Sequence, residues 1–214
     1  MTPTFMGLEP ERIRASLDRV REAIADAGRD PAEVEVLAAT KYVPLGELPA
    51  LAQAGISVVG ENRAQELVEK HGVHGGEFEW DFIGALQSRK VRDVAPLVRL
   101  IHSVASDSAL RQLESHPARE VLVQVNVAGE EGKAGVAPTE LGGFIARCPA
   151  PVGGLATMPP LTDRAEDNRR HFARLAELAS DHGLARLSMG TSQDFAVAAS
   201  EGATIVRLGT VLYT

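Results

Sequence analysis

A lysine and an arginine at unusual positions could together hold a ligand that carries an aldehyde. Lys41 directly follows the apolar run 33–40, and a lysine partly desolvated at the end of a strand has a lowered pKa and can form a Schiff base with a carbonyl group. Arg207 stands inside the apolar run 204–213, where a guanidinium is costly unless it has a partner. The ordinary alternatives are a surface lysine, and an arginine that snorkels to solvent or pairs with a carboxylate.

Two short strings of glycine and hydroxyl residues could bind a phosphate. The strings MGTS and RLGT contain Thr191, Ser192, Gly209 and Thr210. Glycines let backbone N–H groups approach an anion closely, and hydroxyls donate hydrogen bonds to its oxygens. Asp194 is expected to open a helix whose positive N-terminal end adds to the same place. Either string alone is typical of an ordinary turn, but the two together, at the ends of expected strands, favour a phosphate site.

Pyridoxal phosphate suits these groups together, because its aldehyde, pyridine nitrogen and phosphate would each find one partner. A Schiff-base aldolase acting on a phosphorylated sugar would need only the lysine and the phosphate site. Glu61 and Asn62 end one apolar run, and Asn126 lies near the end of another. These three side chains could contact a ring hydroxyl or fix the lysine, or they could be turn or cap residues.

The remaining reactive residue types indicate no further site. His102 lies inside an apolar run and is interpreted as a hydrogen-bonded core histidine, and the other histidines have no metal-ligand spacing. Cys148 is the only cysteine, so the chain can form no intrachain disulfide and no multi-cysteine metal site. We therefore expect no metal and a reducing, cytoplasmic location.

The chain alternates short apolar runs with helical stretches, after an opening helix whose stripe of apolar residues from Ile13 to Ile24 ends at Gly28. Asp163 and Glu166 predict a capping box for the longest of the later helices. The eight expected strands are 33–40, 57–62, 79–86, 99–106, 120–127, 151–158, 186–192 and 204–213. The seven helices between them are 44–54, 63–71, 88–94, 107–115, 139–147, 163–182 and 194–201.

This alternation predicts a parallel sheet, and eight repeats favour a closed (β/α)₈ TIM-type barrel over an open sheet. We expect one domain over residues 1–214, with the extra N-terminal helix. Active sites of such barrels lie where the strands end, and phosphate is often held after strands 7 and 8. The predicted residues therefore fall where a barrel would gather them.

Composition and charge restrict the partners. Apolar residues make up 44% of the chain and the net charge is −7, which is ordinary globular composition without the basic footprint of a nucleic-acid or anionic-lipid binder. The N-terminal run reaches Glu9 and Glu11 before any apolar stretch builds up, so we expect neither a signal peptide nor a membrane span. A small molecule is the expected partner, and nothing demands a partner chain, so we expect a monomer.

The motifs of this sequence resemble, in order, those of the YggS-type pyridoxal phosphate homeostasis proteins. The resemblance covers nearly the whole chain and rests on AATKYVP, GENRAQEL, FIGALQSRK, IHSVAS, VLVQVNVAGEEGKAGV, GLATMPP, LSMGTSQDF and EGATIVRLGT, which span residues 38–210. It implies a barrel like the N-terminal domain of alanine racemase, with pyridoxal 5'-phosphate held as an aldimine of Lys41. It also implies a cytoplasmic protein that buffers or delivers the cofactor, possible recipients being apo-enzymes that depend on it.

The resemblance assigns the other contacts residue by residue. Asn62 and Arg207 would contact the ring, with Arg207 at the pyridine nitrogen, and Thr191, Ser192, Gly209 and Thr210 would hold the phosphate. The family commonly has methionine where Thr191 stands, which leaves only the backbone contact transferable there, and histidine or proline at the position of Ala85.

The resemblance implies no established turnover, and the residues favour the same view. An arginine at the pyridine nitrogen leaves that nitrogen unprotonated, so the ring is a poor electron sink. Racemisation also needs an acid/base opposite Lys41, and neither Tyr42 nor Tyr213 is marked for that role. A cofactor-binding protein is therefore expected, and a weak amino-acid racemase is the alternative.

Overall fold

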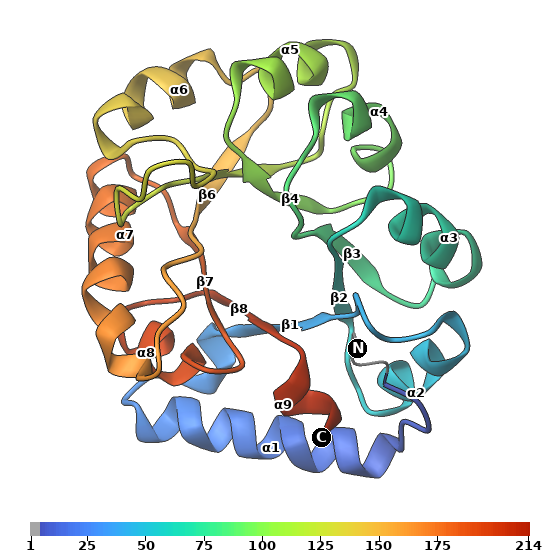
Figure 1. The fold of residues 1–214 in the computed structure, drawn as a ribbon. Helices are drawn as coiled ribbons and strands as arrows, with labels where there is room; N and C mark the ends of the chain where they lie inside the picture. The colour runs from blue at the N-terminus through green and yellow to red at the C-terminus, as the bar shows by residue number, and fades with distance from the viewer. Residues whose placement is uncertain (1–4) are drawn as a thin grey trace.

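The computed structural model describes residues 5–214, and residues 1–4, part of the N-terminal run in which no signal peptide is expected, lie outside the described residues. The predicted barrel is confirmed, because the strands pair in parallel and in chain order and β1 closes the ring against β8 (Figure 1). The strands are β1 Glu35–Ala39, β2 Val58–Glu61, β3 Glu79–Phe82, β4 Leu100–Val104, β5 Val121–Gln124, β6 Val152–Ala156, β7 Arg186–Thr191 and β8 Ile205–Leu208.

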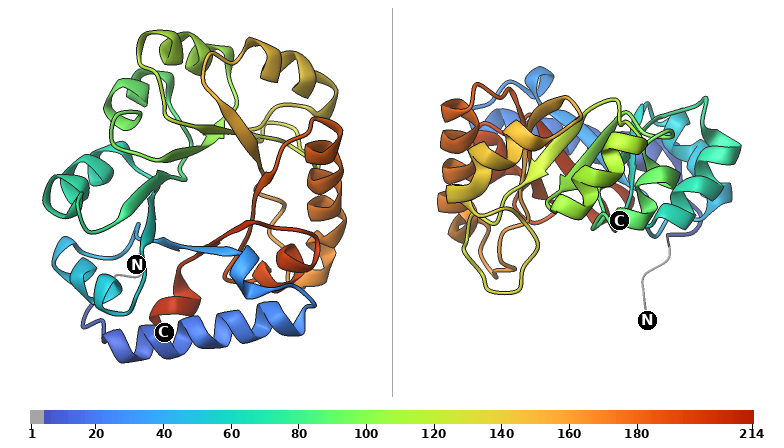
Figure 2. Two further views of the ribbon diagram at one scale, coloured as in Figure 1. Left: turned by 180° about the vertical axis from the view of Figure 1, so that it is seen from behind. Right: turned by 90° about the horizontal axis from the view of Figure 1, so that it is seen from above.

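Helices form an outer ring around the strands, as both ends of the barrel show in Figures 1 and 2. The α-helices are α1 Pro10–Asp26, α2 Leu48–Gln53, α3 Ala64–His74, α4 Val91–Val94, α5 Asp107–Ser115, α6 Leu141–Arg147, α7 Arg169–Asp181, α8 Phe195–Ser200 and α9 Thr210–Tyr213. Short 3₁₀ turns are η1 Pro31–Glu33, η2 Leu45–Glu47, η3 Ser88–Lys90, η4 Pro138–Glu140 and η5 Ala165–Asn168. None of these helices, within residues 5–214, has the length and apolar character needed to cross a bilayer.

The extra N-terminal helix is present and buries the stripe that predicted it. Ile13, Leu17, Val20 and Ile24 of α1 are all buried. Gly28 follows the helix with a φ of +83°, a left-handed conformation that favours glycine and ends the helix. In Figure 1 the helix lies along the outside of the barrel beside α9, so the first and last α-helices of the described residues are neighbours.

The predicted capping box at Asp163 and Glu166 is wrong. The segment begins as η5, whose N-cap Arg164 makes no side-chain capping bond, and α7 starts only at Arg169. Glu166 instead pairs with the Arg169 guanidinium. The Glu166 carboxylate therefore binds a side chain three residues later in the chain and does not bind a backbone N–H at the start of the helix.

The last expected strand, 204–213, is half wrong. The strand β8 ends at Leu208, and residues after Gly209 turn into the short helix α9. Leu212 is buried, and the Tyr213 hydroxyl donates to the Ala39 carbonyl of β1 at 3.2 Å. Packing these two side chains against the barrel wall requires the chain to turn, which a continuing strand would not do.

The barrel interior is filled by side chains. Its apolar layer consists of Leu37, Val58, Leu100, Leu122, Ala156 and Ile205. Space is so tight that a Cβ at Gly60 would lie 2.6 Å from Leu37 Cδ2, which explains the glycine in β2. A larger apolar cluster lies between the strands and the surrounding helices. The interior is thus a packed core, as expected for an eight-stranded barrel.

Candidate functional site

The predicted site residues follow four strands that are neighbours in the closed barrel. Lys41 comes after β1 and Asn62 after β2, while β7 and β8 carry the two glycine-hydroxyl strings. Pairings of β7 with β8, β8 with β1 and β1 with β2 place these strand ends in a row. The carboxyl ends of parallel strands meet at one end of a barrel, so the fold gathers the predicted residues on one face.

Lys41 is exposed, and the residue before it, Thr40, is fixed by two hydrogen bonds. The Thr40 hydroxyl donates to Glu61 Oε1 at 2.7 Å, and the Thr40 carbonyl accepts from Lys70 Nζ at 2.8 Å. Glu61 and Lys70 are themselves a buried ion pair with Nζ and Oε1 2.5 Å apart. The Lys41 amine lies 5.0 Å from the centre of the Tyr42 ring. Glu61 therefore fixes the backbone that carries the lysine, which was one of its two predicted roles.

Lys70 was not predicted, although the sequence contains a signal for it. It lies on the same face of α3 as the buried residues Ala64 and Leu67, three positions after the leucine. A lysine on the buried face of a helix needs a partner. Only the fold shows that the partner is Glu61, on a strand nine residues earlier.

Asn62 offers an unsatisfied group to the site. Its side-chain Oδ1 is buried without a hydrogen-bond partner among residues 5–214. Gly84 presses on its backbone, since a Cβ there would lie 1.9 Å from the Asn62 carbonyl oxygen. A buried amide atom without a partner is costly, so a polar ligand group at this point would be stabilising.

Arg207 points into the barrel and is almost fully fixed. Its Nη1 donates to the Ser188 carbonyl at 2.8 Å and to Ser188 Oγ at 2.5 Å, and its Nη2 donates to the Thr157 carbonyl at 2.8 Å and contacts Met158 Sδ at 2.9 Å. Within residues 5–214 none of its hydrogen-bond partners is a carboxylate and only 8% of it is exposed, so neither ordinary alternative holds. Burial lowers its pKa to about 10, which leaves the guanidinium charged at neutral pH. The fifth N–H, on Nε, finds no acceptor in the described part of the chain.

Two backbone N–H groups converge where the phosphate was predicted. Ser192 Oγ accepts from the N–H of Gly209 at 3.1 Å and from that of Val211 at 3.4 Å. Amides that converge on one oxygen are the usual arrangement for binding an anion. Thr210 is exposed at the same place, at the start of α9.

Thr191 is engaged differently from its neighbours. Its N–H and its hydroxyl both donate to Asp194 Oδ1, at 2.7 and 3.1 Å, and Asn168 donates to the other Asp194 oxygen at 2.8 Å. Asp194 is the N-cap residue of α8, as predicted, but it makes no side-chain capping bond. The Thr191 side chain thus holds Asp194 and shapes the turn after β7.

The weaker candidates have structural partners. The Asn126 carboxamide bonds the backbone of Glu130 in both directions and so closes the loop that follows β5, which agrees with a cap role. His102 is a buried core histidine, as predicted, between Ser188 and Asp81. Burial raises the pKa of the Cys148 thiol, which disfavours its nucleophilic form.

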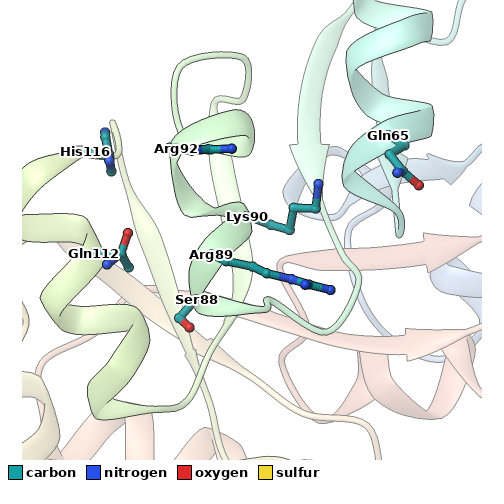
Figure 3. Close-up of a pocket in the computed structure, with 7 residues that line it drawn as sticks. All are labelled: Gln65, Ser88, Arg89, Lys90, Arg92, Gln112 and His116. Carbon is teal, nitrogen blue, oxygen red and sulfur yellow. The ribbon is translucent and has the colours of Figure 1, made fainter.

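Two other kinds of site come into question within residues 5–214, a metal centre and a basic hollow on the outside of the barrel. Among residues 5–214, no three His, Cys, Asp or Glu side chains are grouped to hold a metal ion. A hollow on the outside of the barrel is lined by basic and amide side chains, but Arg89 and Lys90 extend toward Gln65 while Gln112 and His116 lie on the far side (Figure 3). Its cations do not converge on one point.

Comparison with known proteins identifies the family. A family model described as "Alanine racemase, N-terminal domain" matches residues 10–214. The chain is 39% identical over 219 aligned positions to the pyridoxal phosphate homeostasis protein of Aquifex aeolicus, with 95% of this chain and 96% of that one covered. The chain belongs to the pyridoxal phosphate homeostasis protein family. The family member from Pseudomonas aeruginosa is 38% identical, with 95% of this chain and 94% of that one covered.

Solved structures agree with this family and its fold. A protein of Bifidobacterium adolescentis described as unknown superposes with a TM-score of 0.85 at 29% identity, covering 95% of each chain. PipY of Synechococcus elongatus, whose structure was solved with PLP bound, gives a TM-score of 0.79 at 29% identity, covering 94% of this chain and all of that one. The expected resemblance to the pyridoxal phosphate homeostasis family is confirmed.

Proposed function

We propose that this chain binds pyridoxal 5'-phosphate through Lys41 and buffers or delivers it. The observation that carries the proposal is the grouping, on one barrel face, of an exposed lysine, a buried charged arginine and two converging backbone N–H groups. These match the aldehyde, the pyridine nitrogen and the phosphate of the cofactor, one partner each. The names of the family members and the PLP-bound state of PipY support the same cofactor.

Each residue has a role that its surroundings support. When bound, the cofactor supplies an aldehyde open to a primary amine and an electron-withdrawing ring. Lys41 provides the amine, and the pair Glu61–Lys70 holds the backbone before it. Asn62 offers its unsatisfied carboxamide to a polar ring substituent, and Arg207 donates an N–H to the pyridine nitrogen.

The phosphate is proposed to bind at the ends of β7 and β8. The N–H groups of Gly209 and Val211 and the hydroxyl of Ser192 would exchange their present bonds for bonds to phosphate oxygens. Thr210 adds its exposed hydroxyl. Thr191 does not contact the phosphate directly but holds the turn that carries Ser192, because its own N–H and hydroxyl are bound to Asp194.

We propose storage of the cofactor and not turnover as the main role. A guanidinium at the pyridine nitrogen donates a hydrogen bond but does not transfer its proton, so the nitrogen stays unprotonated. Racemisation would be favoured by a protonated ring, because that ring is the better electron sink. The Tyr213 hydroxyl is bonded to a carbonyl, and burial raises the pKa of this phenol, so it is a poor acid/base at neutral pH. The alternative is a weak pyridoxal-phosphate-dependent racemase.

The near-visible absorbance of the purified protein tests the binding proposal. Wild-type protein incubated with pyridoxal 5'-phosphate should turn yellow, and borohydride reduction followed by peptide mass spectrometry should place the adduct on Lys41. Lys41→Ala should abolish the band, whereas Lys90→Ala, on the outer helix layer, should leave it unchanged. A wild-type protein that stays colourless would contradict the proposal and favour a different aldehyde or no ligand.

Exchange of the α-proton separates storage from turnover. The yellow protein is incubated in deuterated water with each enantiomer of alanine and of other amino acids, and exchange is followed by NMR. We expect no exchange above that of free cofactor. Steady exchange that Lys41→Ala removes would establish the racemase alternative.

We further propose that the protein acts in the cytoplasm as a monomer and passes the cofactor to apo-enzymes. A single cysteine, half-buried and unable to form an intrachain disulfide, is compatible with a reducing compartment. Light scattering checks the mass in solution. Activation of an apo-enzyme by the loaded protein, at a rate different from that with free cofactor, checks delivery.

A further inference from the structure

Six polar side chains cross the barrel interior in one continuous chain of hydrogen bonds. The chain starts at the proposed cofactor site and ends at the opposite face, where the first residue of β1 lies. Three of its members, in the middle, are completely or almost completely buried. The six members of this interior chain, each bonded to the next, are Arg207, Ser188, His102, Asp81, Arg99 and Glu35.

From Arg207 to Asp81 each member of the interior chain donates to the next, and Arg99 donates to the carboxylates on both of its sides, Asp81 and Glu35. Arg99 forms two hydrogen bonds to Asp81, at 2.7 and 3.1 Å, so the Asp81 carboxylate is ionised and accepts from His102 Nε2 at 3.1 Å. His102 Nδ1 must then accept a hydrogen bond from the Ser188 hydroxyl, whose oxygen lies 2.8 Å away, because a neutral imidazole carries one N–H. The Ser188 oxygen is left to accept from Arg207. A single tautomer satisfies every member.

The surroundings of His102 favour its neutral form, mainly through burial. Burial lowers the pKa of its imidazole, and the positive charges of Arg207 and Arg99 lower it further, although Asp81 acts in the opposite direction. Burial by itself would raise the pKa of Asp81, but hydrogen bonds from His102 and Arg99 outweigh it and hold that pKa below its usual value. The protonation states that the geometry requires are therefore those that the surroundings favour.

A buried polar chain of this kind stabilises a barrel no more than apolar side chains of the same volume would. Burying ionised groups costs solvation energy, and apolar side chains of similar volume are often equally stabilising. The neighbouring interior positions Leu100 and Ile205, two residues from His102 and Arg207 on their strands, are apolar. Packing therefore does not explain the polar members of the interior chain. Their connection to Arg207, at the proposed cofactor site, suggests that they serve ligand binding.

We propose that Ser188 and His102 are positioning residues for Arg207, which keep its Nε–H for the pyridine nitrogen of the cofactor. His102 Nδ1 accepts a hydrogen bond from the Ser188 hydroxyl, which leaves the serine oxygen lone pairs free to accept from the guanidinium. With the Ser188 and Thr157 carbonyls, this oxygen fixes the plane of the guanidinium. The inference rests on the proposed function, since it assigns Arg207 a ligand.

The cofactor-free protein tests the interior chain independently of the ligand. Long-range ¹⁵N–¹H correlation spectra should show His102 as the Nε2–H tautomer, neutral at pH 6, with the assignment made from the His102→Gln spectrum. A protonated ring at that pH, or the Nδ1–H tautomer, would overturn the inference.

Four variants then test the role toward the cofactor. Ser188→Ala and His102→Leu should each weaken pyridoxal 5'-phosphate binding about tenfold, the loss expected for a hydrogen bond to a charged group. They should also shift the absorbance maximum of the bound chromophore, which reports the charge next to its ring. His102→Gln can donate to Asp81 and accept from Ser188, so it should restore both values. Ser103→Ala is the matched control, because this buried hydroxyl on the same strand has no partner among the described residues.

The outcomes separate the two proposals. If wild type binds the cofactor but folded Ser188→Ala keeps both affinity and band position, the positioning role is wrong while the proposed function stands. If wild type does not bind, the proposed function fails and the positioning role fails with it. Thermal unfolding checks that the variants fold. If His102→Leu does not fold, Ser188→Ala alone decides the test.

Discussion

The buried pair of Glu61 and Lys70 is the residue-scale feature that holds the proposed lysine in place. Lys70→Met removes the cationic partner of a carboxylate with no exposed surface, so we expect a loss of about 3 kcal/mol or more in unfolding free energy. Lys90→Met is the control, because its pair with Asp93 is partly exposed and should cost less than about 1 kcal/mol. Urea denaturation measures both. Equal losses would show that the Glu61 carboxylate does not depend on the Lys70 charge.

His102 also makes stability depend on pH in a defined direction. Its pKa is lowered in the folded state, so the unfolded chain takes up a proton near pH 6.5 before the folded chain does. The unfolding free energy should therefore fall as pH decreases from 7 toward 5, by at most about 1.4 kcal/mol per pH unit for this one proton. His102→Gln should flatten this slope in urea denaturation series. His171, whose pKa burial also lowers, should retain its share in both proteins, so a slope unchanged by the substitution would contradict the neutral assignment.

At the scale of elements, the turn between β7 and α8 shapes the proposed phosphate site. Gly190 has a φ of +92°, and a Cβ there would lie 2.6 Å from the Ala198 Cβ. Gly202 has the same conformation, with φ +93°, but a Cβ there would meet only Leu187 Cδ1 at 3.8 Å. The two glycines separate backbone strain from steric overlap.

Alanine at these two positions should have different effects. Gly202→Ala should cost about 1–2 kcal/mol from the left-handed backbone alone. Gly190→Ala should cost more, because overlap with α8 adds to that strain, and it should also weaken pyridoxal 5'-phosphate binding by moving Thr191 and Ser192. Denaturation and absorbance titration measure the two effects. Equal stabilities would mean that α8 moves freely to accommodate the methyl group.

At the scale of the whole molecule, ligand binding across four strands should stabilise the entire barrel. A ligand at one hundred times its dissociation constant adds about 2.7 kcal/mol, which for a domain of this size raises the thermal midpoint by roughly 5–10 °C. Pyridoxal 5'-phosphate should produce such a shift in differential scanning calorimetry. Pyridoxal, which lacks the phosphate, should produce a smaller shift at the same concentration. The same shift for both would argue against the phosphate contacts at Ser192 and Gly209.

Most of the barrel could be predicted from the sequence because a buried parallel strand leaves a local pattern, a short run of apolar residues. A strand covered on both faces is a short apolar run, and eight such runs separated by helical stretches predicted eight strands. Local signals failed where a long-range contact decided the conformation. Residues 210–213 have the composition of a strand but form α9, because Leu212 and Tyr213 pack against the barrel wall.

Candidate site residues could be predicted where chemistry and strand position coincide, as at Lys41, Arg207 and Ser192. Lys70, Asp81 and Arg99 were missed, because each is an ordinary charged residue until a distant partner is known. Asn126 has a polar side chain at a strand end, yet it binds its own loop. Residue type and position therefore indicated the proposed site, but not which polar groups are available to a ligand.

The sequence by itself determined the eight strands, the barrel and the face on which the proposed site lies, since apolar runs and helical periodicity are properties of neighbouring residues. Only the tertiary structure decided the hydrogen-bond partners across the barrel. Ser188 and His102 are 86 positions apart and meet because the sheet closes on itself. The direction of each proton in the interior chain depends on all of its members together, so no local pattern could encode it.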